Sequence, residues 1–318
     1  MSALLRLTGR RLLQLPVMIL GITLLVFVVM SFSKVDPAIQ ALGEGASLDA
    51  RESYREANGL NDPLLVRYFS FLGGLLHLDL GTYSARRTPV ATAVGDALPV
   101  TLQLTFLGLV IAVVFSLLLG VLAALYRDRW VDKAVRVISI ASLAMPSFWL
   151  AVLLIQGLTL GLGLLPAGGP LPSFTEDPGG YLARMALPAI SLAVPVIGSL
   201  TRVVRTAVVE ELDKDYVRTA IGAGLPRVVV VGRNVLRNAL ITPITVLGLR
   251  VGYLIGGAVV IEVIFALPGM GTLILNGVTN NEPNLVQGVT LTVALAFVLV
   301  NIVVDLLYVL VNPRIRTV

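Results

Sequence analysis

The sequence lacks several of the residues on which enzyme and metal chemistry depend. It contains no cysteine and a single histidine among its 318 residues. Without cysteine the chain can form no disulfide, no thiolate metal site and no thiol nucleophile. His77 alone supplies neither a metal site nor an acid–base pair, so we expect it to be an ordinary surface residue.

Charged residues are also scarce, at 14% of the chain, whereas a soluble domain carries roughly 25%. None of the lysines, Lys34, Lys133 and Lys214, follows a glycine, so the chain has no Walker A phosphate-binding loop. Neither a G-x-S-x-G nor an H-E-x-x-H motif is present. We therefore expect no enzymatic activity and no cofactor bound by the chain itself.

Apolar residues, by contrast, make up 56% of the chain and are gathered into long blocks. A membrane-spanning helix needs about 20 consecutive, mostly apolar residues. Six blocks reach that length, which predicts an all-α integral membrane protein with six transmembrane helices. Pro146 lies near the middle of the third block, where a kink is tolerable. The expected spans cover residues 12–33, 97–126, 137–163, 181–201, 239–265 and 285–311.

The distribution of lysine and arginine predicts the orientation of these spans. With the N-terminus inside, 16 of the 24 basic residues fall in cytoplasmic segments, and the outer loops 165–180 and 266–284 contain none. We therefore expect both termini in the cytoplasm of a multi-pass membrane protein. The net charge of +5 is then a topology signal, and nucleic acid is not an expected partner.

The spacing of the spans divides the chain into three parts. Residues 1–33 form an N-terminal segment with the first span, residues 34–96 form an extracytoplasmic cap loop, and residues 97–318 form a core of five further spans. The cap carries charges of both signs, but loops of this length cross the membrane largely regardless of charge. An apolar face predicts that the cap is folded. That face consists of Tyr68, Phe69, Phe71, Leu72, Leu75 and Leu76.

A polar segment, residues 210–238, separates the fourth and fifth spans on the cytoplasmic side. It predicts a short amphipathic helix from Asp215 to about Ala223, ended by the Gly224–Pro226 sequence. Glycine tolerates positive φ, and the residue before a proline is pushed out of the helical region. From composition alone two interpretations stay open, an ordinary surface helix or a docking surface for a soluble partner.

Ionisable residues inside the expected spans are few, namely Arg250, Glu262 and Asp305. Arg250 and Glu262 lie about 18 Å apart along one helix, so they cannot pair directly. A secondary transporter that works alone is expected to show inverted repeats and a charged site at the midplane of the membrane. Neither is evident here, yet a stand-alone secondary transporter or channel remains the alternative hypothesis.

At residues 216–240 the sequence resembles the permease subunits of bacterial ATP-binding-cassette importers, and within them the dipeptide/oligopeptide/nickel branch. The family signature is Glu-Ala-Ala, three residues, then Gly; here these positions are Arg218, Thr219, Ala220 and Gly224. Tyr-Val-Arg-Thr-Ala before that glycine is the usual form in the peptide branch. Residues 59–81, 262–273 and 305–316 resemble further stretches of the same branch, in the same order along the chain.

The resemblance implies a fold like that of type I importer permeases, in which residues 97–318 are the permease core. It also implies that the helix beginning at Asp215 is a coupling helix that contacts an ATPase. The expected contact residues are Asp215, Tyr216, Arg218, Thr219, Ala220, Gly222, Ala223 and Gly224. A second family motif follows the fifth span and comprises Glu262, Pro268, Gly269 and Gly271.

The resemblance further implies the partners of the chain in a bacterial plasma (inner) membrane. Two cytoplasmic ATPase subunits or domains would bind ATP and Mg, and a second homologous permease, commonly a different chain, would complete a heterodimer. A solute-binding protein would deliver di- or oligopeptides from outside. Since this delivery protein largely selects the substrate, the permease sequence leaves the choice among dipeptides, oligopeptides, glutathione and nickel chelates open.

Overall fold

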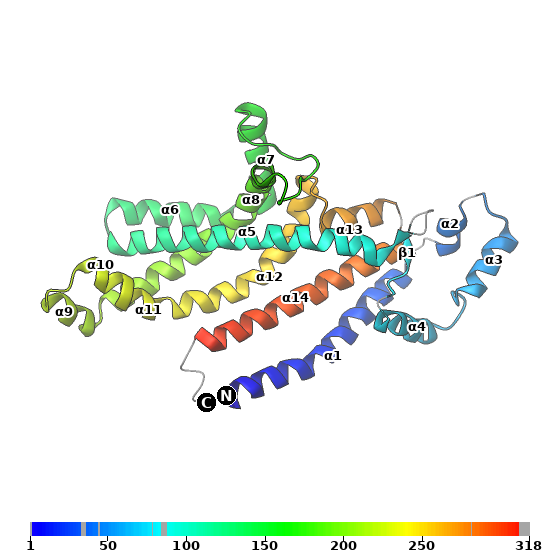
Figure 1. Cartoon of the computed structure of the whole chain (residues 1–318), viewed down its shortest axis with the longest axis horizontal. Helices are drawn as coiled ribbons and strands as arrows, with labels where there is room; N and C mark the ends of the chain where they lie inside the picture. The colour runs from blue at the N-terminus through cyan, green and yellow to red at the C-terminus, as the bar shows by residue number, and fades with distance from the viewer. Residues whose placement is uncertain are drawn as a thin grey trace.

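The computed structural model describes residues 2–32, 36–43, 45–77, 79–83, 88–280 and 282–311, with side chains described except at residues 2–15, 40–41 and 305–311. The described chain is mostly helical, and its long helices run roughly alongside one another (Figure 1). These helices are α1 (Ser2–Ser31), α5 (Val90–Leu125), α8 (Pro178–Leu212), α12 (Ile241–Ile264) and α14 (Pro283–Val311).

Four of the described helices, α5, α8, α12 and α14, are long and apolar enough to cross a membrane, and a bent pair makes a fifth candidate. For α1 the apolar stretch with described side chains is Pro16–Ser31, which is shorter than a full span. The prediction of a mostly helical, multi-pass protein is therefore confirmed, whereas the sixth span stays a prediction. The helix α5 begins at Val90, before the expected Ala97.

The third predicted span, residues 137–163, is wrong as a single helix. It consists of α6 (Trp130–Ala144), α7 (Ser147–Leu154) and the π-helix η1 (Ile155–Gly161), with a bend of 103° at the break. Met145, the residue before Pro146, is extended at φ −88° and ψ 118°. Proline has no N–H to donate and disfavours a helical conformation in the residue before it, so the helix ends at the break. Figure 1 shows α7 projecting away from the long helices.

The described residues of the cap form three short helices and a small hairpin. The helices are α2 (Pro37–Leu42), α3 (Leu48–Ala57) and α4 (Leu64–Leu76), and β1 (Thr82–Tyr83) pairs antiparallel with β2 (Thr88–Pro89). Asp36 caps α2 by accepting a hydrogen bond from the Ala38 N–H at 3.0 Å and forms an ion pair with Arg55 of α3. The hydrogen bond from Arg55 lowers the pKa of the Asp36 carboxyl. This pair therefore joins α2 to α3.

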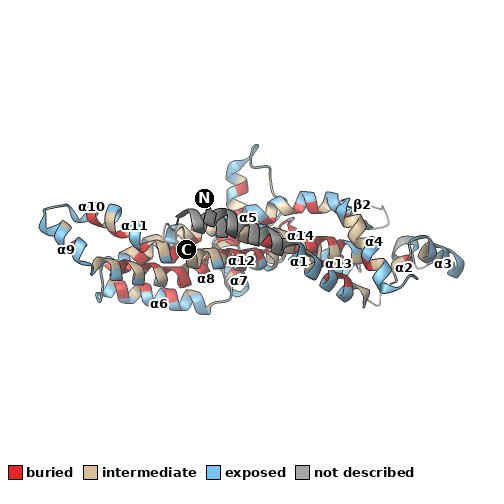
Figure 2. Ribbon diagram, turned by 90° about the horizontal axis from the view of Figure 1, so that it is seen from below, coloured by how far each residue is buried: buried red, intermediate tan, exposed pale blue. Residues whose placement is uncertain are grey.

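The core lies where α5, α8 and α12 pack together, with α8 the most buried of the candidate spans. Leu104 of α5, Leu192 of α8 and Leu254 of α12 are fully buried within one cluster. Buried positions gather along the long helices, whereas α3 and α9 (Asp215–Gly222), at opposite ends, are largely exposed (Figures 1 and 2).

The loop expected after the fifth span is partly helical. Residues Met270–Thr279, predicted from the sequence only as part of an outer loop, form α13. Ten residues are too few for hydrophobic periodicity to indicate a helix, because it needs a window of about 11–18 residues. The polar segment continues after α9 as α10 (Arg227–Val229), η2 (Val230–Val235) and α11 (Leu236–Ala239).

Candidate functional site

The predicted docking helix is present as α9, with the bounds Asp215–Gly222 that the sequence indicated to within one residue. Its end is a Schellman motif, a pair of hydrogen bonds that closes many helices. The Leu225 N–H donates to the Ala220 carbonyl at 3.2 Å, and the Gly224 N–H donates to the Ile221 carbonyl at 3.0 Å. Gly224 adopts φ +83°, a conformation that glycine reaches without steric cost.

The inner face of α9 holds the helix against the rest of the chain. Val217 is 3% exposed and packs in a cluster with Val204 and Val208 of α8 and Val230 and Val235 of η2. Ala220 is half-buried against the same cluster. Because these contacts are internal, the helix is fixed in place before any partner binds.

A polar contact fastens the first turn of α9. The Tyr216 hydroxyl donates to Glu211 Oε1 at 2.8 Å and accepts from Asn238 Nδ2 at 3.4 Å. Burial raises the pKa of the Tyr216 hydroxyl. Tyr216 thus links the end of α8 to α11, although the residue remains 38% exposed.

The outer face of the segment exposes apolar side chains at one end of the molecule. Ile221 is 42% exposed, Leu225 45%, Val228 84% and Val229 43%. Asp215 and Arg218 lie beside them as an exposed pair 3.7 Å apart. Contiguous exposed apolar surface with a polar border is typical of a protein interaction site. We call these four apolar residues the tip patch. Sequence reasoning missed Leu225, Val228 and Val229, although the apolar run after the glycine could have indicated them.

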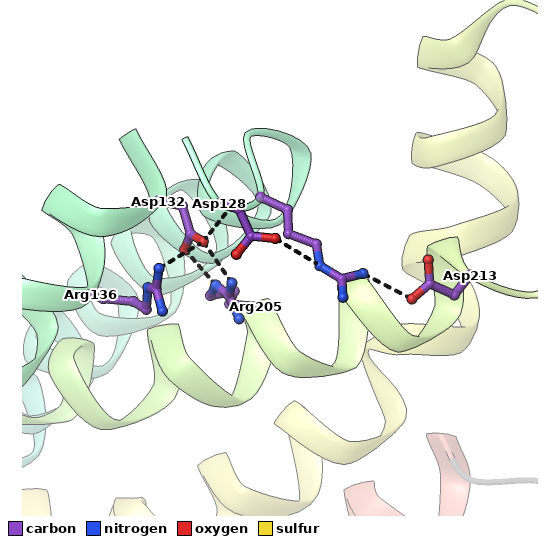
Figure 3. Close-up of polar contacts among 6 residues, drawn as sticks. Asp128, Asp132, Arg136, Arg205 and Asp213 are labelled. Carbon is purple, nitrogen blue, oxygen red and sulfur yellow. Dashed lines mark hydrogen bonds and ion pairs between the residues drawn. The ribbon is translucent and has the colours of Figure 1, made fainter. Parts of the chain in front are cut away.

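An ion-pair cluster lies between α6 and α8 at the same end (Figure 3). Asp132 is fully buried, and Arg205 binds both of its oxygens, with Nε 2.5 Å from Oδ1 and Nη2 2.7 Å from Oδ2. Arg136 approaches Oδ2 at 3.4 Å, and the Asp128 N–H donates to the same oxygen at 3.0 Å. The first turn of α6 is therefore tied to the C-terminal half of α8.

A second polar contact lies between this cluster and the start of α9. Arg127, in the turn between α5 and α6, donates from Nη1 to Asp213 Oδ2 at 3.0 Å (Figure 3). Asp213 is the residue on which α8 ends, two positions before α9 begins. Polar contacts thus run from the α5–α6 turn to the entrance of α9. Sequence reasoning missed this arrangement because Asp132 and Arg205 are 73 residues apart.

The second predicted motif lies at the other end of α12 and forms a tight turn. Glu262 is fully buried, and its Oε2 accepts a hydrogen bond from the Gly271 N–H at 2.7 Å. A Cβ at Gly269 would lie 2.3 Å from the Glu262 carboxyl carbon, and one at Gly271 would lie 2.1 Å from the Val259 carbonyl oxygen. Pro268 is exposed between them. Glu262, Gly269 and Gly271 are therefore together, and they are remote from α9.

Comparison with known families identifies the chain. Residues 116–317 match the family described as binding-protein-dependent transport system inner membrane component, and residues 4–105 match the N-terminal family of the same membrane component. The chain belongs to this family. The resemblance that residues 216–240 indicated is thereby confirmed, and α9 and the Glu262 turn both fall inside the larger matched region.

The chain is similar over nearly its whole length to three proteins that are named as transport system permeases. It is 39% identical over 302 residues to a putative peptide transport system permease protein of Brucella abortus (strain 2308), covering 95% of this chain and 96% of that protein. The probable D,D-dipeptide transport system permease protein DdpB of Escherichia coli (strain K12) is 36% identical, with 95% and 94% covered. The oligopeptide transport system permease protein AppB of Bacillus subtilis (strain 168) is 36% identical, with 96% and 98% covered.

One solved structure has a related fold. It is described as an amino acid ABC transporter with histidines, and it superimposes with a TM-score of 0.51 at 14% sequence identity. The superposition covers 70% of this family member and 94% of that chain. At this identity the likeness concerns the fold alone, and it agrees with a permease-like arrangement of the long helices.

Proposed function

We propose that the chain is the permease subunit of an ATP-driven importer that moves di- or oligopeptides across the bacterial inner membrane. Family membership supports the transport role, and the names of the similar proteins from Brucella, E. coli and B. subtilis support peptides as the substrate. ATP and Mg would be bound by separate ATPase subunits. The observation that carries the proposal is the tip patch, which exposes apolar surface on a helix already fixed by internal contacts.

In this proposal the tip patch and α9 contact the ATPase. A helix that is pre-fixed by Val217 and Tyr216 loses little conformational freedom on docking, which favours binding. Asp215, Arg218 and Thr219 lie on the exposed side of α9. At the end of the helix, Gly222, Ala223 and Gly224 have no side chain or only a methyl group. The exposed Gly224 has nothing within 4 Å of a Cβ position, so close approach of a partner is possible there.

The proposal also places the chain in the membrane. Six spans, α1, α5, the bent α6–α7 pair, α8, α12 and α14, would leave both termini and α9 in the cytoplasm and the cap outside. The separation of α9 from α3 along the molecule supports this arrangement (Figure 1). A solute-binding protein would meet the outer side, and a second, homologous permease would complete a heterodimer.

A matched pair of substitutions tests the docking assignment. We expect Leu225→Asp to abolish co-purification of the ATPase and ATP-driven peptide uptake, because a charge would replace apolar contact area. Leu48→Asp makes the same chemical change at a leucine that is 81% exposed in the cap. The Leu48 variant should retain the ATPase. Both variants are compared after solubilisation from the native membrane, with mass spectrometry of the bound proteins.

Two results would overturn the assignment. If the Leu225 variant keeps both the ATPase and uptake at normal levels, the tip patch is not the docking surface. If the wild-type chain is recovered alone and still moves peptide in liposomes without ATP, the stand-alone transporter hypothesis replaces the importer.

A further inference from the structure

The cap helix α4 has three faces of different character. One face packs on α1 through Tyr68, which is 8% exposed, and Phe71. A second face carries Arg67 and the exposed Ser70. The third is an apolar stripe spaced at helical intervals and consists of Leu65, Phe69, Leu72 and Leu76. A helix with one polar and two apolar sides needs a second apolar environment besides α1.

The contact with α1 fixes the depth of α4. The Tyr68 hydroxyl donates to the Leu20 carbonyl at 3.1 Å and lies 3.0 Å from Thr23 Oγ1. Phe27 packs on Phe71 with a ring separation of 6.0 Å. The contacted residues Leu20 and Phe27 lie about 16 Å and about 6 Å before the end of α1 at 1.5 Å per residue, and the hydrocarbon core is about 30 Å thick. With α1 spanning the membrane, α4 lies beside its outer half.

The apolar stripe is open, and α1 also has an open apolar face, on the side away from its contact with α4. Leu65 is 70% exposed, Phe69 67% and Leu76 86%. On α1, Leu25 is 65% exposed and Val29 60%. These fractions are those of surface residues, yet the side chains are large and apolar on both helices. Exposed apolar surface of this kind is stable beside lipid and unfavourable in water.

The polar face of α4 borders a cavity. Arg67 lines a cavity of about 440 Å³ between α1, the other cap helices and the start of α14. That cavity is also lined by Asp36, Arg55 and Asn61. Helical geometry puts Arg67 and Phe69 about 200° apart around the helix axis. The charged side chain thus faces polar groups of the cap, while the stripe faces away from them.

We propose that α4 is an interfacial membrane helix whose stripe of Leu65, Phe69, Leu72 and Leu76 lies in the outer leaflet, at the boundary of headgroups and acyl chains. An interfacial helix combines an apolar face buried about 5–10 Å into this boundary with a polar face toward water. The neighbouring α3 differs, since its exposed residues include Asp49, Glu52 and Glu56. The cap therefore has one helix in water and one in lipid.

This inference rests on the proposed placement of α1 as a span, and the experiment separates the two. The chain has no cysteine, so single cysteines can be introduced for a fluorescent label without removing native ones. The positions are Leu65→Cys and Phe69→Cys on the stripe, Ser70→Cys on the polar face, Ser53→Cys on α3 and Leu25→Cys on α1. Each variant is reconstituted as the whole transporter in lipid nanodiscs.

Two quenchers report the environment of each label. Lipids with a nitroxide near the glycerol end of the acyl chain should quench labels at Leu65, Phe69 and Leu25 severalfold more than labels at Ser70 and Ser53. Aqueous iodide should give the reverse order. Blue-shifted emission at the stripe positions, relative to the label at Ser53, is expected from the same cause.

Three results would contradict the proposals, the first the topology and the other two the lipid assignment of α4. If the label at Leu25 is not quenched by the lipid nitroxide, the placement of α1 and thus the proposed topology is wrong. If Leu25 is quenched but Leu65 and Phe69 respond only to iodide, α4 is not in the leaflet. If the stripe labels become protected from iodide only after a solute-binding protein is added, the stripe is a protein contact and the lipid assignment is overturned.

Discussion

Asp132 and Arg205 form a two-point ion pair that joins the first turn of α6 to α8, with the Asp132 carboxylate fully buried. Replacing Asp132 with Asn would leave the guanidinium groups of Arg205 and Arg136 without a carboxylate partner. Breaking a buried pair in this way costs about 3–5 kcal/mol of stability. We expect Asp132→Asn to lower the thermal stability of the purified transporter strongly, as measured by its loss of monodispersity on heating.

The exposed pair Arg127–Asp213 supplies the control for this prediction. Asp213 is 63% exposed, and surface ion pairs are worth about 0–1 kcal/mol. Asp213→Asn should therefore leave thermal stability nearly unchanged while loosening the polar contact that leads to α9. Equal destabilisation by both substitutions would show that burial of Asp132 is not the source of the effect.

The cap should respond to acid through Asp36. Its hydrogen bond from Arg55 lowers the pKa of the carboxyl in the folded state below the ordinary value of about 3.9. The stabilisation is therefore complete above that ordinary value and is lost as pH falls through the lowered one. We expect hydrogen exchange of α2 and α3, corrected for intrinsic rates, to rise in that acid range and to be insensitive to pH changes above it.

An Asp36→Asn variant isolates the contribution of this carboxylate. It should show raised exchange in α2 at neutral pH and little further increase in acid. Unchanged exchange at neutral pH in the variant would mean that Asp36 does not hold α2 and α3 together.

Much of the long-helix arrangement could be predicted, because apolar blocks of bilayer length and the basic residues between them are local signals. The docking helix was also predictable, since a glycine followed by Leu-Pro ends a helix through backbone geometry alone. Its internal fixation by Val217 was not, because the cluster joins buried residues from five separate elements of the chain. The tip patch was likewise not predictable, because the sequence does not show that Val217 is buried and Val228 is exposed.

Two errors in the predicted spans have physical causes. Residues 90–96 include Gly95 and Asp96, which ended the apolar pattern, yet the structure continues α5 back to Val90. Pro146 predicted a tolerable kink, whereas the structure has a bend of 103° followed by a π-helix. A proline indicates where a helix is weakened, but packing against neighbouring helices decides how far it turns.

The turn after α12 should be intolerant of side chains. Gly271→Ala would place a Cβ 2.1 Å from the Val259 carbonyl oxygen, which is backbone and cannot move aside cheaply. We expect this variant to have much lower expression and thermal stability than the wild-type protein. Gly256→Ala, in α12 itself, meets nothing within 4 Å and should be neutral or stabilise by about 0.5–1 kcal/mol. Similar behaviour of the two variants would contradict the close-packed turn.

The last prediction concerns Arg250, a charged residue inside α12. It lines a cavity of about 260 Å³ at the break between α6 and α7, together with Pro146, Pro195 and Tyr253. No ion pair involves Arg250 among the residues that the structure describes. A charged side chain within a span is costly and is by default a functional residue. We therefore expect Arg250 to contact the peptide, whose C-terminal carboxylate is a suitable partner, as it crosses the membrane.

Uptake measurements with two substitutions test this role. Arg250→Gln should lower ATP-driven peptide uptake about tenfold or more, because a hydrogen bond to a charged group is worth roughly 1.5–3 kcal/mol. The variant should still assemble with its ATPase, since Arg250 is remote from α9. Leu249→Gln changes the adjacent residue, which is 79% exposed, and should leave uptake near the wild-type level. Wild-type uptake by the Arg250 variant would mean that the guanidinium serves only the packing around the α6–α7 break.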